Sequence, residues 1–420
     1  MEIAVIGSGG REHAVAWKLA QSKSADKVFV LPGNGGTENN IPIDVNDFAG
    51  IKKFCESEAI ELIFVGPEDP LANGIVDYFA DTDIMVFGPD KEAAQLEGSK
   101  VFAKKFMRKY GVATAEYHEF GGVQNDCCQQ FTIFPQDTIK KMQGNCVIKF
   151  DGLAAGKGVF VCSSVEEAEE AVEEIKKTYG ENAHFLIEEK LKGKELSILA
   201  FTDGESYQIL LPSQDHKQLL DGDKGPNTGG MGAFCPVPFY TDELKKQIEE
   251  DAIIPTINGF KEENFNFKGI IYIGLMITGN GPKVLEYNVR LGDPETEVVL
   301  PALQSDLLEL VLACFDGSLQ DFEVEFNEGY FVDVVLASGG YPKAYKKGIE
   351  ICGLEEPKEL VFHAGTKKKG GKLITSGGRV LNVVAHGSSL DDAIANTYEK
   401  VKSVYFDDMY FRKDIGKRNN

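Results

Sequence analysis

The chain has 420 residues, 43% of them hydrophobic and 26% charged, a composition typical of a globular protein with two to four compact units at roughly 100–200 residues each. Its formal net charge of −22, from 44 basic and 66 acidic residues, disfavours nucleic acids and anionic membrane surfaces as partners. The eight cysteines form no CxxC pair, and no apolar run approaches the ~20 residues of a membrane span, so we predict reduced thiols, no membrane segment and a cytoplasmic location.

Residues 1–100 alternate short apolar strands with helix-patterned segments. We expect strands at 3–6, 28–31, 62–65 and 85–87, and helices at 12–20 and 47–57. Continuous apolar strands separated by helices are typical of a parallel sheet that is covered on both faces. Each strand runs into glycine or proline at its carboxyl end, where open parallel sheets bind their ligands.

A glycine-rich turn follows the first strand and opens a helix. The backbone amides of Gly7, Gly9 and Gly10 could approach a phosphate at the positive end of that helix. Glu12 stands at the third glycine position of a dinucleotide fingerprint, and the second strand ends at residues 31–34 without the acid that grips a ribose hydroxyl. Phosphate binding is therefore favoured over a plain strand–helix turn, and NAD is disfavoured.

A second glycine loop, residues 151–158, joins expected strands at 146–150 and 159–162. Its spacing before Lys157 does not match a Walker A loop, and no helix follows it directly. A flexible hairpin could instead close over ATP phosphates as a lid, while Lys149 holds a phosphate from the end of the preceding strand. The alternative is a surface hairpin with solvated lysines, which glycine-rich backbone disfavours on entropic grounds. Helices are expected on either side, at 99–110 and 165–178.

Acidic and polar segments follow. Carboxylates at the strand end 185–189 could contact the adenine amino group and ribose hydroxyls, although such residues are usually only solvated. The stretch 212–232 is polar and shows no secondary-structure period, which is typical of either a functional loop or disorder. The apolar residues directly after it favour an ordered substrate loop.

A hairpin is predicted from strands at 270–278 and 283–291. On the second strand Glu286, Asn288 and Arg290 fall two residues apart and therefore on one face. A carboxylate beside an amide oxygen suits Mg²⁺, and the arginine adds a planar fork for a phosphate or carboxylate. An exposed polar strand face is the alternative, but the first strand is apolar on both faces, so its partner should be central and its charges paired.

The end of the chain is predicted to be β-rich. Strands are expected at 330–336, 361–364 and 379–386, with a closing helix at 390–403. The basic glycine run at 367–372 reads as a solvated turn.

Taken together, these segments resemble the phosphoribosylamine–glycine ligase family, also called glycinamide ribonucleotide synthetase. The likeness runs over nearly the whole chain and is specific because so many motifs occur in order. They are GGREHA (9–14), PGNGGT (32–37), GPEDPL (66–71), AAQLEGSK (93–100), DGLAAGKGV (151–159), QDHK (214–217), GPNTGGMGA (225–233), EYNVRLGDPET (286–296), HAGT (363–366) and SGGRVL (376–381).

The resemblance implies an α/β and α+β multidomain protein with an ATP-grasp core. We expect a Rossmann-like substrate domain at 1–100, a small ATP-grasp subdomain with the glycine lid at 101–190, a large subdomain with the metal and substrate site at 191–327, and a β-rich domain at 328–420.

The resemblance also implies the site residues. Lysines would hold ATP phosphates, Glu188 the adenine and Glu195 the ribose. The implied ATP-binding residues are Lys104, Lys149, Gly152, Gly156, Lys157, Gly158, Glu188, Glu189 and Glu195. The implied metal ligands, for Mg²⁺ or Mn²⁺, are Glu286 and Asn288. The implied substrate-binding residues are Gly9, Gly10, Arg11, Glu12, His13, Asp215, His216, Lys217, Asn227, Thr228, Gly229, Gly230, Met231, Arg290, Asp293, Pro294 and Glu295. The expected catalytic groups are Arg290, Lys149 and Asp215.

The sequence departs from the family pattern in a few places. Phe150 stands where Ala is usual, Gln218 replaces an Arg after the DHK motif, and Phe234-Cys235 replaces a Tyr-Ser pair. The apolar strand at 270–278 lacks the metal-binding acid that many ATP-grasp relatives carry there, so metal coordination is expected to rest on fewer protein ligands.

The reaction implied is ATP-dependent ligation of glycine to phosphoribosylamine through glycyl phosphate, by a monomer or weak dimer. Another ATP-grasp ligase or carboxylase of purine biosynthesis would share the ATP residues and differ within 212–233. A nucleotide-binding regulator or inactive scaffold is disfavoured because Lys149, Glu286, Asn288 and Arg290 are intact. A dehydrogenase is disfavoured by Glu12 and the missing ribose acid.

Overall fold

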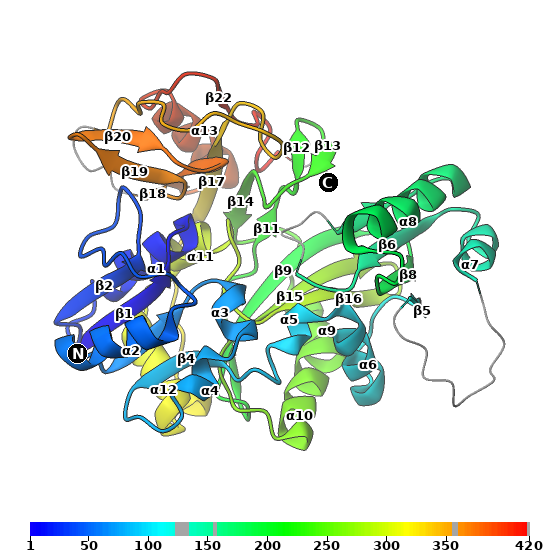
Figure 1. The fold of residues 1–420 in the computed structure, drawn as a ribbon, viewed down its shortest axis with the longest axis horizontal. Helices are drawn as coiled ribbons and strands as arrows, with labels where there is room; N and C mark the ends of the chain where they lie inside the picture. The colour runs from blue at the N-terminus through cyan, green and yellow to red at the C-terminus, as the bar shows by residue number, and fades with distance from the viewer. Residues whose placement is uncertain (122–133, 154–157, 355–359, 418–420) are drawn as a thin grey trace.

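The computed structural model of the chain describes residues 1–121, 134–153, 158–354 and 360–417. In Figure 1 the amino-terminal strands lie below the carboxy-terminal sheet, and a small sheet with the helices α7 (Pro135–Lys141) and α8 (Val165–Tyr179) stands at the other side. None of the helices in the described ranges is both long and apolar enough to cross a membrane.

The first part of the chain confirms the predicted parallel sheet. Its strands are β1 (Glu2–Gly7), β2 (Lys27–Pro32), β3 (Leu62–Val65) and β4 (Met85–Pro89), in the order β2–β1–β3–β4. Val5 of β1 packs in one core with Val15, whereas Ile6 packs in another core with Ile51. Because neighbouring residues of one strand enter different cores, the sheet is covered on both faces.

Short helices connect these strands and follow the last of them. They are α1 (Gly10–Leu19), α2 (Phe48–Glu58), α3 (Glu68–Ala72), α4 (Ile75–Tyr78) and α5 (Gln95–Gly98). Helix α1 begins earlier than predicted because Glu12 occupies its third position and caps the amide of Gly9. Helix α2 begins after Asp47, whose side chain accepts a hydrogen bond from the Gly50 amide.

The parallel strands continue into an antiparallel half, and the sequence did not indicate that the two parts form one sheet. Strand β4 pairs with the first residues of β15 (Phe267–Thr278), and β15 pairs in turn with β9 (Lys194–Thr202) and β16 (Gly281–Asn288). Strand β10 (Tyr207–Ile209) completes this sheet beyond β9. The predicted hairpin is confirmed, but its second strand ends at Asn288 and not at residue 291.

The small sheet contains β5 (Tyr117–Phe120), β6 (Cys146–Phe150), β7 (Val159–Val161) and β8 (Phe185–Glu189), in the order β5–β8–β6–β7. Helix α6 (Lys100–Tyr110) leads into it, and the predicted strand–loop–strand arrangement around residues 151–158 is confirmed because β6 and β7 pair antiparallel. Ile148 and Ile187 of the sheet pack with Val172 of α8 in a core of their own.

The predicted substrate loop is ordered, but the expectation that it lacks regular structure is wrong. It holds β11 (Gln214–Asp215), β12 (Gln218–Leu220), β13 (Lys224–Asn227) and the start of β14 (Gly232–Cys235). Strand β14 pairs with β17 (Tyr330–Ser338), so the loop is anchored in the carboxy-terminal sheet. Their polar sequence concealed the strands β12 and β13, which pair with each other, and the partner of β14 is distant in sequence.

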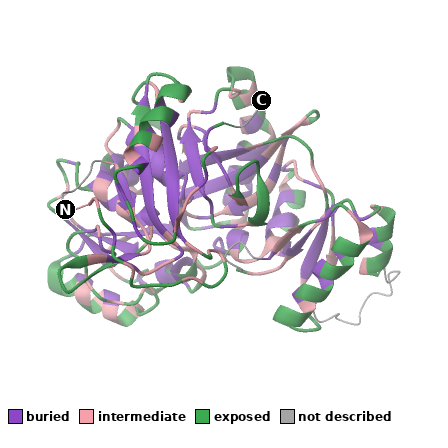
Figure 2. Ribbon diagram, turned by 90° about the horizontal axis from the view of Figure 1, so that it is seen from above, coloured by how far each residue is buried: buried purple, intermediate pink, exposed green. Residues whose placement is uncertain are grey.

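The carboxy-terminal sheet has the order β11–β14–β17–β21–β18, with β22 (Met409–Tyr410) beside β17. Strands β18 (Val361–His363) and β21 (Arg379–Gly387) and helix α13 (Leu390–Val401) lie where they were predicted. The run expected to be a turn is instead a hairpin of β19 (Thr366–Lys369) and β20 (Lys372–Thr375). The remaining helices are α9 (Asp242–Ile248), the π-helical η1 (Glu249–Ile253), α10 (Ile254–Glu263), α11 (Thr296–Ala302), α12 (Leu307–Asp316) and the 3-10 helix η2 (Leu319–Asp321). Figure 2 shows the strands buried and the exposed residues along the outer faces of the helices.

Candidate active site

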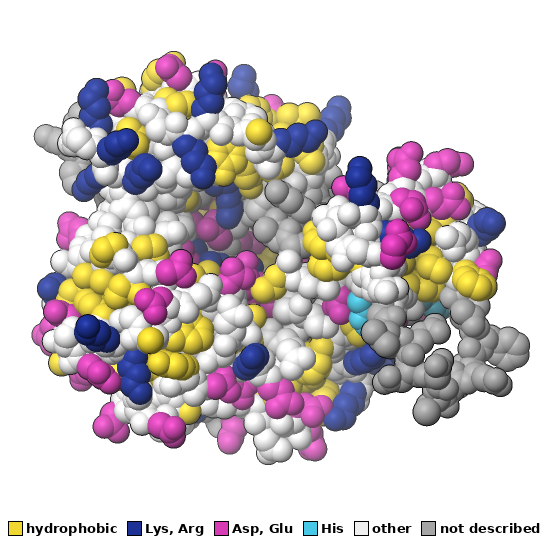
Figure 3. All heavy atoms as spheres, in the orientation of Figure 1, with side chains coloured by type: hydrophobic (Ala, Val, Ile, Leu, Met, Phe, Trp, Pro, Cys, Tyr) yellow, Lys and Arg dark blue, Asp and Glu magenta, His cyan; other side chains and the backbone are white. Residues whose placement is uncertain are grey.

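A cavity of about 910 Å³ opens between the amino-terminal turns, the small sheet, β15–β16 and the carboxy-terminal sheet. On the face of the molecule that Figure 3 shows, a recess lies near the centre, with acidic and basic side chains around it. The cavity is called the cleft below. The predicted site residues that line it are Gly9, Arg11, Glu12, Lys104, Lys149, Gly152, Gly158, Glu188, Asp215, Lys217, Asn227, Thr228, Gly229, Glu286, Asn288, Arg290, Asp293 and Glu295.

Two predicted lysines meet one carboxylate in the cleft. Lys104 comes from α6, Lys149 from β6 and Glu188 from β8, and both ammonium nitrogens lie 3.1 Å from the same Glu188 oxygen, Oε2. Lys149 also donates to the Leu285 carbonyl at 2.9 Å, and Lys104 to the Thr114 hydroxyl at 2.7 Å. The other Glu188 oxygen, although buried, accepts no hydrogen bond from the described residues. It is therefore available to a donor on a ligand, such as an amino group.

Burial changes the acidity of this cluster. Desolvation, opposed by Glu188 and assisted by the charge of Lys149, lowers the pKa of Lys104 to about 8. Lys104 therefore still carries its proton near neutral pH, and an anionic ligand can stabilise its charge.

Glu286 lies at the centre of the cleft, on β16. Its Oε1 lies 3.6 Å from the ammonium nitrogen of Lys217, a residue of the substrate loop. Burial raises the pKa of Glu286, but the charges of Lys217, Lys149 and Lys100 outweigh it and hold that pKa at about 2. The carboxylate is therefore ionised under all ordinary conditions.

The residues present fit a divalent cation with few protein ligands. Glu286 and Asn288 both line the cleft from one strand face, as predicted. Within the described part of the chain no group of three or more His, Cys, Asp or Glu side chains could hold a metal ion. Mg²⁺ commonly binds through one or two protein oxygens and completes its shell with water and substrate phosphates, so this pair is sufficient.

Arg290 lies beyond the strand on which it was expected. Strand β16 ends because the Val289 amide donates to Glu97 Oε2, at 2.9 Å, instead of a neighbouring strand. The guanidinium of Arg290 then contacts Glu97 Oε1 at 2.7 Å and Glu68 Oε2 at 3.3 Å, and donates to Asn288 Oδ1 at 3.3 Å. The arginine is thus already paired with two carboxylates, which the sequence did not predict.

These two partners differ in acidity. Burial raises the pKa of Glu97 to about 7, although Arg290 acts against it. For Glu68 the opposite holds, since Arg290 and Arg11 outweigh burial and lower its pKa to about 2. Arg290 can therefore keep one ionised partner while the other carries a proton.

The amino-terminal glycine turn differs from the predicted open phosphate site. Glu12 Oε2 accepts the Gly9 amide at 2.5 Å, and Glu12 Oε1 pairs with Arg11 Nε at 2.6 Å. Arg11 also donates to the Leu291 carbonyl at 3.0 Å. Glu12 thus occupies an amide that was expected to face phosphate.

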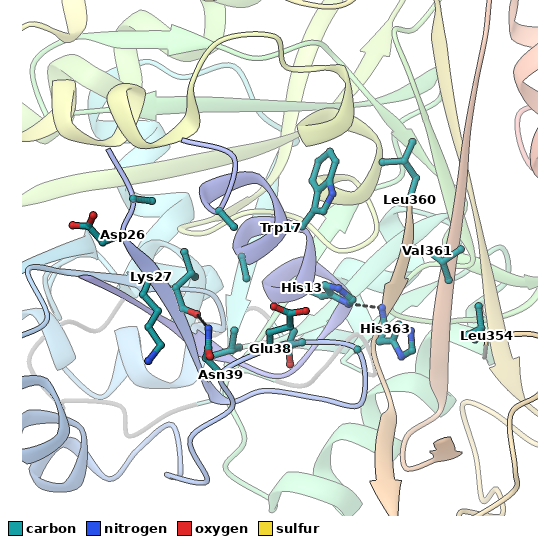
Figure 4. A pocket seen from close by; sticks show the side chains of 17 residues that line it. His13, Trp17, Asp26, Lys27, Glu38, Asn39, Leu354, Leu360, Val361 and His363 are labelled. Carbon is teal, nitrogen blue, oxygen red and sulfur yellow. Dashed lines mark hydrogen bonds between the residues drawn. The ribbon is translucent and has the colours of Figure 1, made fainter. Parts of the chain in front are cut away.

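Two predicted histidines lie away from the cleft. Figure 4 shows His13 in a second cavity, of about 520 Å³, beside residues 36–39 and His363. His13 Nδ1 accepts the His363 amide at 2.8 Å, and burial lowers the pKa of His13 to about 3. His216 is buried and accepts the Gly416 amide at Nε2, at 3.1 Å. His13 lines the second cavity and His216 does not line the cleft, so their assignment to the substrates stays a prediction.

Other predicted residues also lie outside the cleft lining or outside the described residues. Those not lining the cleft are Gly10, Glu189, Glu195, Gly230, Met231 and Pro294, with His13 and His216. Glu195 nevertheless lies 4.0 Å from Lys217 Nζ. Gly156 and Lys157 fall outside the described residues, whereas Gly152 and Gly158 on either side of them line the cleft. The expectation that Gly156 and Lys157 contact ATP therefore stays a prediction.

The cleft is also lined by residues that sequence reasoning missed, and one of them, Arg379, comes from the carboxy-terminal sheet. Arg379 Nη1 lies 3.1 Å from Asp293 Oδ1 and donates to the Gly229 carbonyl at 2.6 Å. Tyr272 of β15 donates to Glu295 Oε1 at 3.0 Å. The missed cleft residues include Glu68, Glu97, Lys100, Tyr272, Tyr341, Lys343, Tyr345 and Arg379. The motifs GPEDPL, AAQLEGSK and SGGRVL contain four of them and were the available signal.

Comparison with known proteins decides the family. Models of the phosphoribosylglycinamide synthetase N domain, ATP-grasp (A) domain and C domain match residues 1–97, 98–296 and 331–418 in turn. The chain belongs to the phosphoribosylglycinamide synthetase family. The resemblance found in the sequence is thereby confirmed.

Individual members of the phosphoribosylglycinamide synthetase family match over their full length. The phosphoribosylamine–glycine ligase of Clostridium acetobutylicum is 47% identical over 423 residues, which cover 99% of this chain and 100% of that protein. The solved phosphoribosylamine–glycine ligase of Thermotoga maritima has a TM-score of 0.83 at 39% identity, with 99% of this chain and 100% of that chain covered.

The ATP-grasp fold is also confirmed by more distant structures. The biotin carboxylase domain of Hydrogenobacter thermophilus 2-oxoglutarate carboxylase, solved with ADP and magnesium, has a TM-score of 0.69 at 15% identity. The match covers 98% of this chain and 91% of that chain. At this identity the likeness shows the fold alone.

Proposed function

We propose that the chain joins glycine to 5-phospho-β-D-ribosylamine with ATP, giving glycinamide ribonucleotide, ADP and phosphate, as a step of purine biosynthesis. The observation that carries this proposal is the cleft. It gathers the Lys104–Lys149–Glu188 cluster, the Glu286–Asn288 oxygen pair and Lys217 of the substrate loop around one cavity. The names of the full-length relatives support the same reaction.

The first step that we propose is phosphoryl transfer. A carboxylate oxygen of glycine attacks the γ-phosphorus of ATP, the bond to the bridging oxygen of ADP breaks, and glycyl phosphate forms. Lys104 and Lys149 hold the phosphates, while the free oxygen of Glu188 accepts the adenine amino group. A bound Mg²⁺ or Mn²⁺, held by Glu286 and Asn288, would supply charge neutralisation for the phosphates.

The second step is aminolysis. The amine nitrogen of phosphoribosylamine attacks the carbonyl carbon of glycyl phosphate, the carbon–oxygen bond breaks, and phosphate leaves. Asp215, buried beside the cleft-lining Lys217, accepts the proton that the amine loses. Arg290, oriented by Glu68 and Glu97, holds an anionic group of the substrates next to the reacting atoms.

Finer features of the enzyme belong to the same proposal. We expect a cytoplasmic monomer or weak dimer with no nucleic-acid partner, in line with its charge of −22. We also propose functional units at residues 1–100, 101–190, 191–327 and 328–420, with the amino-terminal turn holding phosphoribosylamine.

The test is ADP release by the purified chain with each substrate omitted in turn. ADP release that requires glycine, fresh phosphoribosylamine and a divalent cation together is the expected result. Release that is independent of glycine would refute this function and would favour another ATP-grasp ligase or carboxylase.

A further inference from the structure

Two cysteines stand opposite each other where β6 pairs with β7. In the register of this antiparallel pair Val147 faces Val161, so Cys146 and Cys162 meet one step further along. The Cys162 amide donates to the Cys146 carbonyl at 2.9 Å, which extends the ladder to this step. The Cα atoms of such a hydrogen-bonded pair lie about 5.5 Å apart. This is close to the commonest separation in disulfides, about 5.5–6 Å.

Both cysteine side chains enter the core of the small sheet. Cys146 and Cys162 are 0% and 2% exposed, and they pack in one core with Ile139 of α7 and Ala168 of α8. Both are free thiols, and their side chains form a hydrogen bond with each other. The two sulfur atoms are therefore within reach of each other, and a bond between them needs little movement of the backbone.

A positive charge next to the pair favours a thiolate. The ammonium of Lys190 donates to the Cys162 carbonyl at 3.2 Å and to the Ser163 hydroxyl at 2.8 Å, so its position is fixed. The hydrogen bond from Cys162 lowers the pKa of the Cys146 thiol, and the charge of Lys190 adds to this effect although burial opposes it. Because the thiolate is the form that attacks a disulfide, Cys146 is the more reactive partner.

The edge of the small sheet gives a small oxidant access to the pair. Strand β7 has three residues and lies at the end of the order β5–β8–β6–β7, and Val161, next to Cys162, is 54% exposed. A short edge strand opens locally at a lower free energy than the centre of a sheet, because fewer contacts hold it. Local opening of β7 therefore uncovers the thiols while the rest of the chain stays folded.

We propose that Cys146 and Cys162 form an intramolecular disulfide when the folded chain meets a small-molecule disulfide. The Cys146 thiolate attacks one sulfur of the oxidant, the S–S bond of the oxidant breaks, and one half leaves as a thiolate. The Cys162 thiolate then attacks the Cys146 sulfur, the bond between the two cysteines forms, and the second half leaves. Two protein thiols are oxidised, and the oxidant is reduced to two thiols, which take up the two cysteine protons.

This modification site does not depend on the proposed function. The new bond would join the two strands that carry the glycine loop, on the side of the strands away from that loop. A covalent link there restricts the separation of β7 from β6, because a disulfide removes open conformations of the segment that it closes.

The experiment uses the full chain, reduced first and then incubated with oxidised glutathione without denaturant. Remaining thiols are alkylated, and the digested chain is mapped by mass spectrometry. The peptides of Cys146 and Cys162 should be joined to each other, at least about tenfold more often than either is joined to another cysteine. Dithiothreitol should separate them again, and the circular dichroism spectrum should stay unchanged throughout.

Two variants complete the test. Cys146→Ala should leave Cys162 as a free thiol or a glutathione adduct. The matched control is Cys314→Ala, which removes a buried cysteine of α12 and should form the Cys146–Cys162 disulfide as the wild type does. Wild-type chain that keeps both thiols, carries only glutathione adducts there, or joins either cysteine mainly to a different one would overturn the proposal. The wild-type map decides this outcome even if the Cys146→Ala variant does not fold.

Discussion

Single charges in the cleft depend on neighbours that come from distant parts of the chain. Glu286 stays ionised because lysines of α6, β6 and the substrate loop outweigh its burial. Burial raises the pKa of Glu97 to about 7, although Arg290, the Val289 amide and Arg11 act against it. A glutamate is thus ionised and able to bind a cation at position 286, whereas at position 97 it is close to protonation.

Replacement of Glu286 tests the metal site. Glu286→Gln keeps the size of the side chain but removes the charge, and turnover should fall at least about a hundredfold because the phosphates lose their counter-charge. Steady-state ADP release measures the effect, with the exposed Glu262→Gln as the control. Turnover like that of the wild type, with an unchanged thermal midpoint, would remove the metal assignment.

The acidity of Lys104 predicts how ATP affinity depends on pH. Because burial lowers the pKa of this lysine to about 8, it loses its proton as pH rises through that value, and ATP affinity should fall there. Arginine at this position stays charged, so Lys104→Arg should bind ATP with little change between about pH 7 and about pH 9. A wild-type affinity that stays flat over this range would contradict the assignment of Lys104 to the phosphates.

At the scale of elements, helix α11 packs against the strands β17 and β21. Buried carboxyl oxygens at this contact have no hydrogen-bond partner among the described residues. Glu297 of α11 and Asp333 of β17 are fully buried, and neither carboxyl group accepts a hydrogen bond within the described ranges. Burial, with the nearby charge of Asp293, raises the pKa of both groups well above ordinary values, although Arg379 acts against it. The neutral forms are therefore favoured in the folded chain.

This raised pKa predicts a loss of stability with increasing pH. Protonated carboxyl groups stabilise the fold below the ordinary values of 4.5 and 3.8, and that stability is lost as pH rises toward the folded pKa. Glu297→Gln removes the titration at this position and should stabilise the chain on the order of 1–2 kcal/mol at about pH 8. Urea unfolding at several pH values gives the comparison, and the difference should vanish near about pH 4. An equal difference at both pH values would show that burial of the charge is not its cause.

At the same scale, local sequence patterns predicted the presence of helices and strands better than the residues at which they end. The apolar runs of β1, β3 and β6 decide those strands without help from the rest of the chain. The end of β16 could not be predicted, because it depends on Glu97 capturing the Val289 amide from far away in the sequence. Strand β14 was missed for the same reason, since its partner is β17, whereas β12 and β13 pair with each other and were concealed by their polar sequence.

Over the whole molecule, the sequence predicted the classes of domain but not how they join. The amino-terminal sheet and the long antiparallel strands form one continuous sheet, through Phe267 and Lys268 of β15 beside Pro89 and Gly88 of β4. This non-local pairing carries no local signal. It does explain how residues of the amino-terminal segments, such as Glu68, reach Arg290.

The candidate site shows the same division between local and distant information. The oxygen pair of Glu286 and Asn288 follows from strand periodicity alone, and both residues line the cleft. Motif membership could not tell which residues face the cleft, so His13 was expected there beside Glu12. The two residues are neighbours on α1 but point to different sides of the helix, because each helical step turns by about 100°.

Transfer of oxygen from glycine to phosphate tests the central claim most directly. If the cleft activates the glycine carboxylate with ATP, glycine labelled with ¹⁸O in its carboxylate must pass one labelled oxygen to the phosphate that is released. The account predicts labelled phosphate in step with formation of glycinamide ribonucleotide, and none when ATP is omitted. Product formed with unlabelled phosphate would contradict it.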